Sequence, residues 1–339
     1  MILKLALTLG TVTWPEQDRT VTGAETMVRF STGGRPSTPI KPTSVSAHPL
    51  DPTYEPVLGP ILSVKMYGRQ DRLLAMLLEV LSPRLDQLEA RGMLAKWFFV
   101  RYADGDTHFR LRLFAGNAEG SQEVLQRVGT LLDRMMRDGQ IDRWTIEPYR
   151  REWARFGGKA AMPCVEKLFS FDSKQAITTI KALAAEGRYT ADTARPAAVA
   201  LTLGWYRAVA MTRTQSQDLI RHMCQRLRTS TGAERGAYRE DVSAAIAAIK
   251  EGSSYPAPMI HAQSAQRLTQ LGQSPHFSTT LENVTTSLIN MSLNRLMPHW
   301  SREEEHRIYL AAQTCLHAYP EIWNQVALQD EQTPRALAG

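Results

Sequence analysis

The sequence predicts an α+β protein in which a ferredoxin-like split β-α-β-β-α-β unit is followed by a helical region. Two periodicities and one change in composition lead to this prediction. Between residues 61 and 148, short apolar runs that alternate in steps of two are interrupted by segments with the helical period of 3.6. After residue 160 the helical period dominates, whereas eight of the 18 prolines fall between residues 15 and 60.

The proline-rich start is predicted to be an N-terminal arm covering residues 1–58. Proline removes a backbone donor and restrains the residue before it, so the arm cannot form long helices, although residues 26–30 suit a short strand. The arm either stays extended or wraps over the body of the protein. We expect residues 59–320 to form the folded catalytic domain and residues 321–339 to form a C-terminal tail.

The β-α-β-β-α-β unit follows directly after the arm. Its expected strands are residues 61–67, 96–102, 108–114 and 141–148, and its expected helices are residues 71–91 and 122–137. Pro83 should kink or split the first helix. The pair Asp104-Gly105 supplies the positive φ of a tight reversal between the second and third strands. We expect a sheet that is antiparallel apart from the crossover pairs, with both helices on one face.

The region after residue 160 is predicted to be helical. The expected helices are residues 165–170, 173–185, 196–212, 214–228, 239–250, 281–296 and 301–316. Ser173 and Ser301 are predicted N-caps, and Ser301 is followed by Glu303 and Glu304 in the positive first turn. Residues 251–275 are interpreted as a polar connector.

Composition excludes several classes of function. The three cysteines form no CxxC pair and the eight histidines have no metal-ligand spacing, so we expect no metal, no cofactor and a reducing cytoplasm. No apolar run of about 18 residues indicates a membrane span. The nucleotide motifs GxGxxG and GxxxxGK[ST] and the hydrolase motif GxSxG are absent. A net charge of +6 favours an acidic partner, which composition alone leaves open among nucleic acid, membrane and peptide.

Two arginine-rich segments are candidate binding elements. Alternation along the third strand places His108, Arg110 and Arg112 on one face of the sheet, where guanidinium groups can bind carboxylates. The segment YRREWARFGG begins at Tyr149 and contains Arg155, which could reach back over the same face. A solvated strand face and a basic turn are the alternative readings.

A third candidate lies on the helix expected at residues 281–296. Ser287, Asn290 and Asn294 share one face at spacings of three and four. A polar stripe on an otherwise apolar helix must meet water or be satisfied by partners. Interhelical hydrogen bonding is the alternative to a role in chemistry.

Four motifs, in this order, resemble the C-terminal elimination domain of lanthipeptide dehydratases and its stand-alone thiopeptide relatives. They are WFFVRYADGDTHFRLR at residues 97–112, YRREWARFGG at 149–158, EKLFSFDS at 166–173 and SLINMSLNRL at 287–296. The resemblance covers about residues 60–317. It implies the elimination-domain fold and implies that Arg110, Arg112 and Arg155 hold the glutamyl ester of a substrate Ser or Thr. This chain departs from the family at position 290, where Asn290 stands in place of an acid-base histidine.

The departure favours a second activity known on this fold, that of thiopeptide pyridine synthases. These enzymes join two dehydroalanines in a formal [4+2] aza-cycloaddition, then lose water and expel the leader peptide to leave a pyridine. Asparagine cannot take a proton at neutral pH, but it can hold an amide and bring two alkenes together. The expected catalytic residues are Ser287, Asn290, Ser292 and Tyr149, and the expected substrate-binding residues are His108, Arg110, Arg112, Arg155 and Arg295.

The sequence is also compatible with two other functions. The first is elimination of glutamate from glutamylated Ser or Thr, and the second is leader-peptide binding without catalysis. The expected partner is the leader and core of a dehydrated, azole-bearing precursor peptide, with no nucleic acid and no membrane involved.

Overall fold

The computed structural model describes residues 54–57, 59–102, 105–227, 239–250 and 261–325. The chain divides into two compact units, Met1–Leu50 and Asp51–Gly339, and all described residues belong to the second. The strand expected at residues 26–30 lies outside the described residues. The second unit begins ahead of the predicted boundary at residue 59, because Tyr54–Glu55 (β1) pairs with Tyr149–Arg150 (β6) in a small antiparallel sheet.

The main sheet has four strands in the order β3-β4-β2-β5. They are β2 (Ile61–Tyr67), β3 (Lys96–Tyr102), β4 (His108–Phe114) and β5 (Arg143–Glu147). This is the strand order of a ferredoxin-like unit. All three neighbouring pairs are antiparallel. The prediction that crossover-connected strands pair in parallel is therefore wrong, because β4 lies between β3 and β2.

Both helical connections cover the apolar face of the sheet, as predicted. The first connection consists of α1 (Gln70–Met76), η1 (Leu77–Leu81) and α2 (Ser82–Ala90), and the second is α3 (Ala118–Arg137). Trp97 of β3 donates to Asp86 at 3.1 Å and Trp144 of β5 donates to Asp133 at 2.8 Å. These two contacts join α2 and α3 to the same face.

Two helix predictions in this unit are sharpened by the structure. The predicted break at Pro83 is a π-helical turn, in which the amide of Ser82 bonds to the carbonyl of Leu77. Proline at this point has no N–H for the regular ladder, and the wider turn accommodates it. Helix α3 begins ahead of the predicted residue 122, because the Asn117 side chain accepts from the amide of Gly120 at 2.7 Å.

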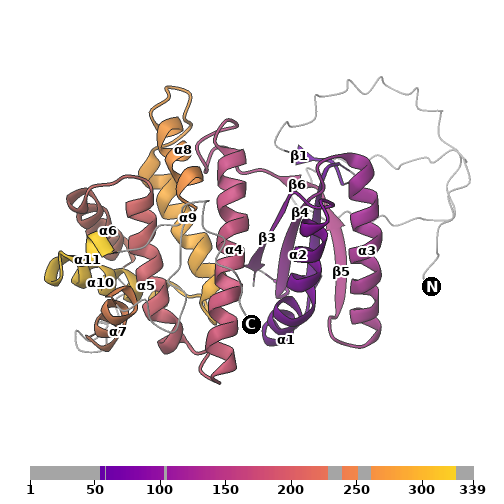
Figure 1. Cartoon of the computed structure of the whole chain (residues 1–339), viewed down its shortest axis with the longest axis horizontal. Helices are drawn as coiled ribbons and strands as arrows, with labels where there is room; N and C mark the ends of the chain where they lie inside the picture. The colour runs from indigo at the N-terminus through magenta and orange to yellow at the C-terminus, as the bar shows by residue number, and fades with distance from the viewer. Residues whose placement is uncertain (1–53, 58, 103–104, 228–238, 251–260, 326–339) are drawn as a thin grey trace, which may run out of the picture. The chain divides into compact units, whose positions relative to one another are not determined.

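The remaining helices pack against each other and against one edge of the sheet (Figure 1). They are α4 (Met162–Ala185), α5 (Ala191–Ala208), α6 (Arg213–Leu227), α7 (Arg239–Lys250), α8 (Ala262–Gly272), α9 (Leu281–Leu296), α10 (Arg302–Ala318) and α11 (Ile322–Gln325). Ser301 caps α10, as predicted, by accepting from the amide of Glu304 at 3.1 Å. Among the described residues, no helix is long and apolar enough to cross a membrane.

Two predictions in the helical region are wrong. The polar connector contains α8, whose buried Ala265 and Leu268 lie three residues apart. Ser173 does not begin a helix but lies fully buried inside the continuous α4. Its hydroxyl instead accepts a hydrogen bond at 3.2 Å from the backbone amide of Phe99 on β3.

The outer edge of β3 is covered by side chains of α4 and α9 instead of by another strand. Asn294 accepts from the amide of Arg101 at 3.0 Å and donates to its carbonyl at 2.9 Å. Arg295 donates to the carbonyl of Phe99 at 2.7 Å. Figure 1 shows α4 running beside this edge. Backbone groups that would be unpaired at a sheet edge are therefore satisfied, and the helical region is tied to the sheet.

Candidate functional site

The polar side chains of β4 lie on the face of the sheet opposite α2 and α3. Arg110 is opposite Val100 and Arg112 is opposite Phe98 on β3, and both arginines lie on the same face, as the alternation predicts. The residues between them on β4 have no exposed surface and belong to the core. The face with the arginines is the only one from which β4 can present side chains to a ligand.

A cavity of about 810 Å³ lies over this face, and we call it the sheet-face cavity. Its walls come from β3, β4, β6, the segment that follows β6, α4 and α9. The lining includes Tyr54, Phe98, Tyr102, Arg110, Arg112, Glu147, Tyr149, Trp153, Arg155, Phe169 and Met291. Three of the predicted arginines and Tyr149 thus meet in one cavity, although they are distant in sequence.

Arg110 is held in place by two aromatic rings. Its guanidinium carbon lies 3.7 Å from the centre of the Tyr102 ring, and its Nε donates to Nε2 of His108 at 3.0 Å. The other ring nitrogen of His108 lies 2.8 Å from the carbonyl oxygen of Asp106. This pattern requires the neutral imidazole with its proton on Nδ1. His108 is buried and does not line the cavity, so it positions Arg110.

Arg112 and Tyr149 form a second stacked pair on the cavity wall. The guanidinium carbon of Arg112 lies 4.8 Å from the centre of the Tyr149 ring. Burial lowers the pKa of Arg112 from its ordinary value, and the charge of Arg110 acts in the same direction. Burial, followed by the carboxylate of Glu166, raises the pKa of Tyr149 far above its ordinary value. Tyr149 therefore keeps its proton, and its hydroxyl group can donate a hydrogen bond to a ligand.

Arg155 is brought to the cavity by a turn that needs both of its glycines. Gly157 has φ +85° and Gly158 has φ +94°, in the left-handed region that other residues rarely adopt. A Cβ on Gly157 would lie 2.1 Å from the ring of Phe277. The hydroxyl of Ser278 donates to the carbonyl of Trp153 at 3.2 Å and fixes the same turn. The orientation of Arg155 is thus set by packing against the segment before α9.

Arg155 also lines a second, more polar pocket between α9 and α10. This pocket has a volume of about 410 Å³, and we call it the α9–α10 pocket. Its lining residues are Arg155, Arg226, Thr279, Asn283, Thr286, Ser287, Asn290 and Glu305. The Nε of Arg155 donates to the hydroxyl of Ser287 at 3.3 Å. The two predicted catalytic residues Ser287 and Asn290 thus lie in a pocket that adjoins the sheet-face cavity through Arg155.

Glu305 is the titratable group of the α9–α10 pocket, and it was not predicted from the sequence. The residue is 8% exposed, and it lines the pocket together with Asn290. Burial raises the pKa of Glu305, while Asn290 and the charges of Arg226 and Arg302 oppose the rise. A carboxyl group with a raised pKa can exchange protons nearer neutral pH than an ordinary glutamate.

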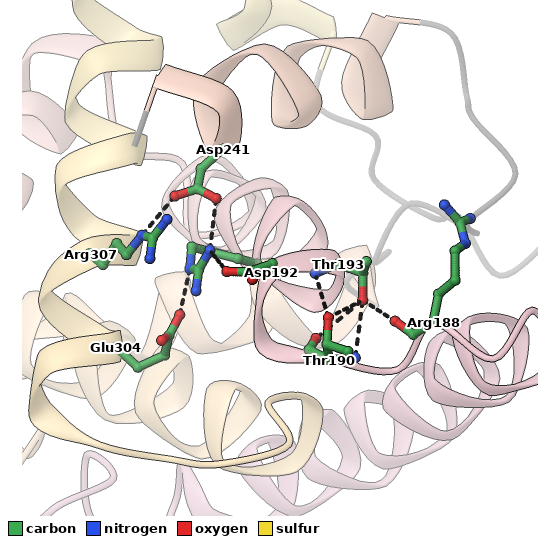
Figure 2. Close-up of polar contacts among 8 residues, drawn as sticks. Arg188, Thr190, Asp192, Thr193, Asp241, Glu304 and Arg307 are labelled. Carbon is green, nitrogen blue, oxygen red and sulfur yellow. Dashed lines mark hydrogen bonds and ion pairs between the residues drawn. The ribbon is translucent and has the colours of Figure 1, made fainter. Parts of the chain in front are cut away.

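A network of ion pairs fixes the start of α10, which carries Glu305 (Figure 2). Glu304 accepts from Arg195 of α5 at 2.5 Å. Asp241 of α7 accepts from Arg195 at 2.8 Å and from Arg307 of α10 at 2.9 Å. Arg195 and Asp241 are buried, so their charges interact more strongly than on the surface. With Glu304 held on one side of α10, Glu305 is directed toward α9.

Besides His108, two more predicted site residues, Ser292 and Arg295, line neither of the two hollows. Arg295 is fully buried, where it donates to Asp172 at 2.6 Å as well as to the β3 edge. Ser292 is buried and accepts from the indole of Trp205 at 2.9 Å. Within the part of the chain that the structure describes, no group of three His, Cys, Asp or Glu side chains could hold a metal ion.

Comparison with known proteins agrees with this fold. The family described as lantibiotic biosynthesis dehydratase C-term matches residues 62–316. The crystal structure of the tRNA-dependent lantibiotic dehydratase MibB from Microbispora sp. 107891 is similar with a TM-score of 0.57 and 20% identity. That similarity covers 76% of this chain but only 28% of MibB. The crystal structure of TsrL is matched over 80% of this chain and 99% of its own, with 14% identity and a TM-score of 0.39. No curated protein matches the sequence.

Proposed function

The chain belongs to the lantibiotic dehydratase C-terminal family, and we propose that it is a thiopeptide pyridine synthase. Members of this family take part in the maturation of ribosomally made peptides. The proposed reaction is the formal [4+2] aza-cycloaddition of two dehydroalanines. Loss of water and of the leader peptide then leaves a pyridine that closes the macrocycle.

The observation that carries the proposal is that Asn290 and the buried Glu305 line the same pocket. The histidine that the resemblance implies for elimination is replaced by a neutral amide, which opposes the rise in the pKa of the neighbouring Glu305 carboxyl group. Cycloaddition requires the imidic-acid form of one peptide amide, and a carboxyl group that holds and releases a proton assists that change. Asn290 and Ser287 provide hydrogen bonds to the same amide. Glutamate elimination instead needs a base that accepts a proton from carbon.

The sheet-face cavity is proposed to hold the peptide around the reacting alkenes. Arg110 and Arg112 present fixed guanidinium groups to carbonyl or carboxylate oxygens, and the Tyr149 hydroxyl can donate to a third. Arg155 borders both hollows, so it can contact the peptide where the two alkenes meet. Bringing two groups of one peptide together is the main contribution that a cycloaddition needs from its enzyme.

The test is conversion of a dehydrated, azole-bearing precursor peptide by the purified protein. We expect mass spectrometry to show a macrocycle that has lost one water and the leader peptide. Recovery of unchanged linear peptide, with a reference pyridine synthase active on the same batch, would contradict the proposal.

Glutamate elimination remains a second candidate because Arg110, Arg112 and Arg155 share one cavity, as the resemblance implies for that reaction. Its test is a peptide that carries glutamylated Ser. Formation of dehydroalanine from that peptide would favour elimination over cycloaddition. A protein that binds precursor peptide in a salt-sensitive way but converts neither substrate would be a binding module.

A further inference from the structure

A groove of about 490 Å³ runs between α2 and α3, on the side of the sheet away from the sheet-face cavity. Its lining residues are Arg84, Gln87, Leu88, Arg91, Glu123, Gln126, Arg127, Val128, Thr130, Leu131 and Arg134. We call it the arginine groove. It has no residue in common with either hollow of the candidate site.

The four arginines form two rows that flank the groove. Arg84 and Arg91 lie seven residues apart along α2 and its C-cap, and Arg127 and Arg134 lie seven apart on α3. Seven residues make two helical turns, or about 10 Å. All four side chains are exposed. Each row therefore presents two positive charges at the spacing at which another helix repeats its side chains.

The floor of the groove is apolar and little of its charge is neutralised. Leu88 is 8% exposed and Val128 is 4% exposed, so both lie at the bottom. The one lining carboxylate, Glu123, pairs with Arg127 at 2.7 Å. Within the described residues, neither Arg91 nor Arg134 has an ion-pair partner. Two positive rows on either side of an apolar strip are complementary to a ligand that has an apolar face flanked by acidic side chains.

We propose that the arginine groove binds an acidic amphipathic helix of the precursor peptide. The apolar side chains of that helix lie on Leu88 and Val128, and carboxylates two turns apart on each flank meet the arginines. This is recognition of a helix in a groove with charge complementarity at its rim. The precursor peptide as the source of the helix rests on the proposed function, whereas the binding itself does not require turnover.

The N-terminal arm of this chain does not have the charge of such a ligand. Residues 1–58 contain five basic residues, Lys4, Arg19, Arg29, Arg35 and Lys41, and five acidic ones, Glu16, Asp18, Glu25, Asp51 and Glu55. Nucleic acid would supply phosphates without the apolar strip that the floor of the groove requires. An acidic peptide is the partner that satisfies both the rows and the floor.

The experiment measures binding of a designed probe to the full chain. The probe is a fluorescein-labelled 18-residue helix with Leu on one face and Glu at positions i and i+7 on both flanks. A second probe has Gln in place of each Glu. We expect fluorescence anisotropy to show binding of the Glu probe that weakens between 50 and 300 mM NaCl, and at least about tenfold weaker binding of the Gln probe.

The variant Arg91→Gln/Arg134→Gln should weaken binding of the Glu probe about tenfold. The control variant Arg221→Gln/Arg267→Gln removes two exposed arginines from α6 and α8, with the same change in net charge. Equal weakening in the two variants, or none in the first, would overturn the proposal. The proposal would also be overturned if a DNA duplex displaced the Glu probe and if the loss of Arg91 and Arg134 weakened binding of the duplex more than binding of the probe.

Turnover separates this inference from the proposed function. With a convertible precursor, the groove variant should raise KM and leave kcat unchanged, since the groove is remote from the reacting atoms. If the protein binds the Glu probe through the groove but converts no dehydrated peptide, the inference about the groove is supported and the proposed function is contradicted. If the variant without both arginines converts the peptide with the same KM as the unmodified protein, the proposed function is supported and the inference about the groove is contradicted.

Discussion

Arg155 donates a hydrogen bond from Nε to the hydroxyl of Ser287 at 3.3 Å, across 132 residues of sequence. The contact joins the turn after β6 to α9 and places one guanidinium on the border between the sheet-face cavity and the α9–α10 pocket. A peptide that enters both hollows must pass this group. Arg155 is therefore the residue whose loss should affect both binding and chemistry.

We expect Arg155→Gln to lower kcat/KM for macrocycle formation by about 100-fold, a typical cost of removing a fixed donor from an active site. Arg155→Lys should recover little activity, because an ammonium group lacks the planar fork of a guanidinium. Arg221→Gln on α6 is the matched control. Activity within about twofold of the unmodified protein for Arg155→Gln, measured by mass spectrometry, would remove Arg155 from the proposed site.

Glu305→Gln tests the carboxyl group of the α9–α10 pocket. The substitution keeps the shape of the side chain but abolishes proton exchange, so kcat should fall by about 100-fold. The unmodified protein should lose activity as pH rises through the elevated pKa of Glu305, and the variant should lack that limb. A variant with the pH profile of the unmodified protein would exclude Glu305 from proton transfer.

The same substitution has a distinct effect on stability. Because burial raises the pKa of Glu305 in the folded state, the unmodified protein loses stability as pH rises through that folded value. Gln at this position does not ionise, so Glu305→Gln should have about the same Tm at pH 4 and a higher Tm at pH 8. Thermal unfolding at several pH values measures the difference. A gap in Tm that does not change with pH would contradict the assigned direction.

Asp241 is the shared partner of the ion network that fixes α10. Asp241→Asn removes one carboxylate from the buried Arg195, which still pairs with Asp192 and Glu304, so we expect the free energy of unfolding to fall by about 1–3 kcal/mol. Asp218→Asn, in an exposed pair with Arg221, should change it by less than about 1 kcal/mol. Urea denaturation compares the two. Equal effects would mean that the buried network contributes no more than a surface pair.

Asn294 makes two hydrogen bonds to the backbone of Arg101, and its removal should expose the edge of β3. Asn294→Ala should lower the free energy of unfolding by roughly 2–4 kcal/mol, because a buried amide and carbonyl lose their partners. Asn283→Ala, an exposed site near the start of the same helix, should cost about 1 kcal/mol or less. Chemical denaturation of both variants decides whether the side chains of α9 hold the sheet.

The local patterns of this sequence predict the strands better than the site. The short apolar runs in residues 61–67, 96–102 and 108–114 reproduce β2, β3 and β4 to the residue, because most side chains of these strands are buried. Alternation along β4 places Arg110 and Arg112 correctly on the open face. The bounds of α9 also follow from its apolar period.

Contacts between distant elements account for what the sequence did not predict. Ser292 is two positions beyond Asn290, about 200° around the helix, so it faces Trp205 and not the pocket. Arg295 satisfies the edge of β3 and the carboxylate of Asp172. Glu305 becomes a site residue only because α9 and α10 pack together, and no motif marks it. The Glu-Glu-Glu run at residues 303–305 indicates only a favourable start of a helix.

The closure of β3 by Asn294 also has a consequence for synthesis of the chain on the ribosome. The backbone of Arg101 has no partner from Asn294 until the ribosome has added 193 more residues. At about 5–20 residues per second, that interval is roughly 10–40 s. During it the nascent sheet has an open edge that can pair with another chain. Shortening the interval by circular permutation, or slowing translation before α9, should therefore change the yield of soluble protein without changing the final fold.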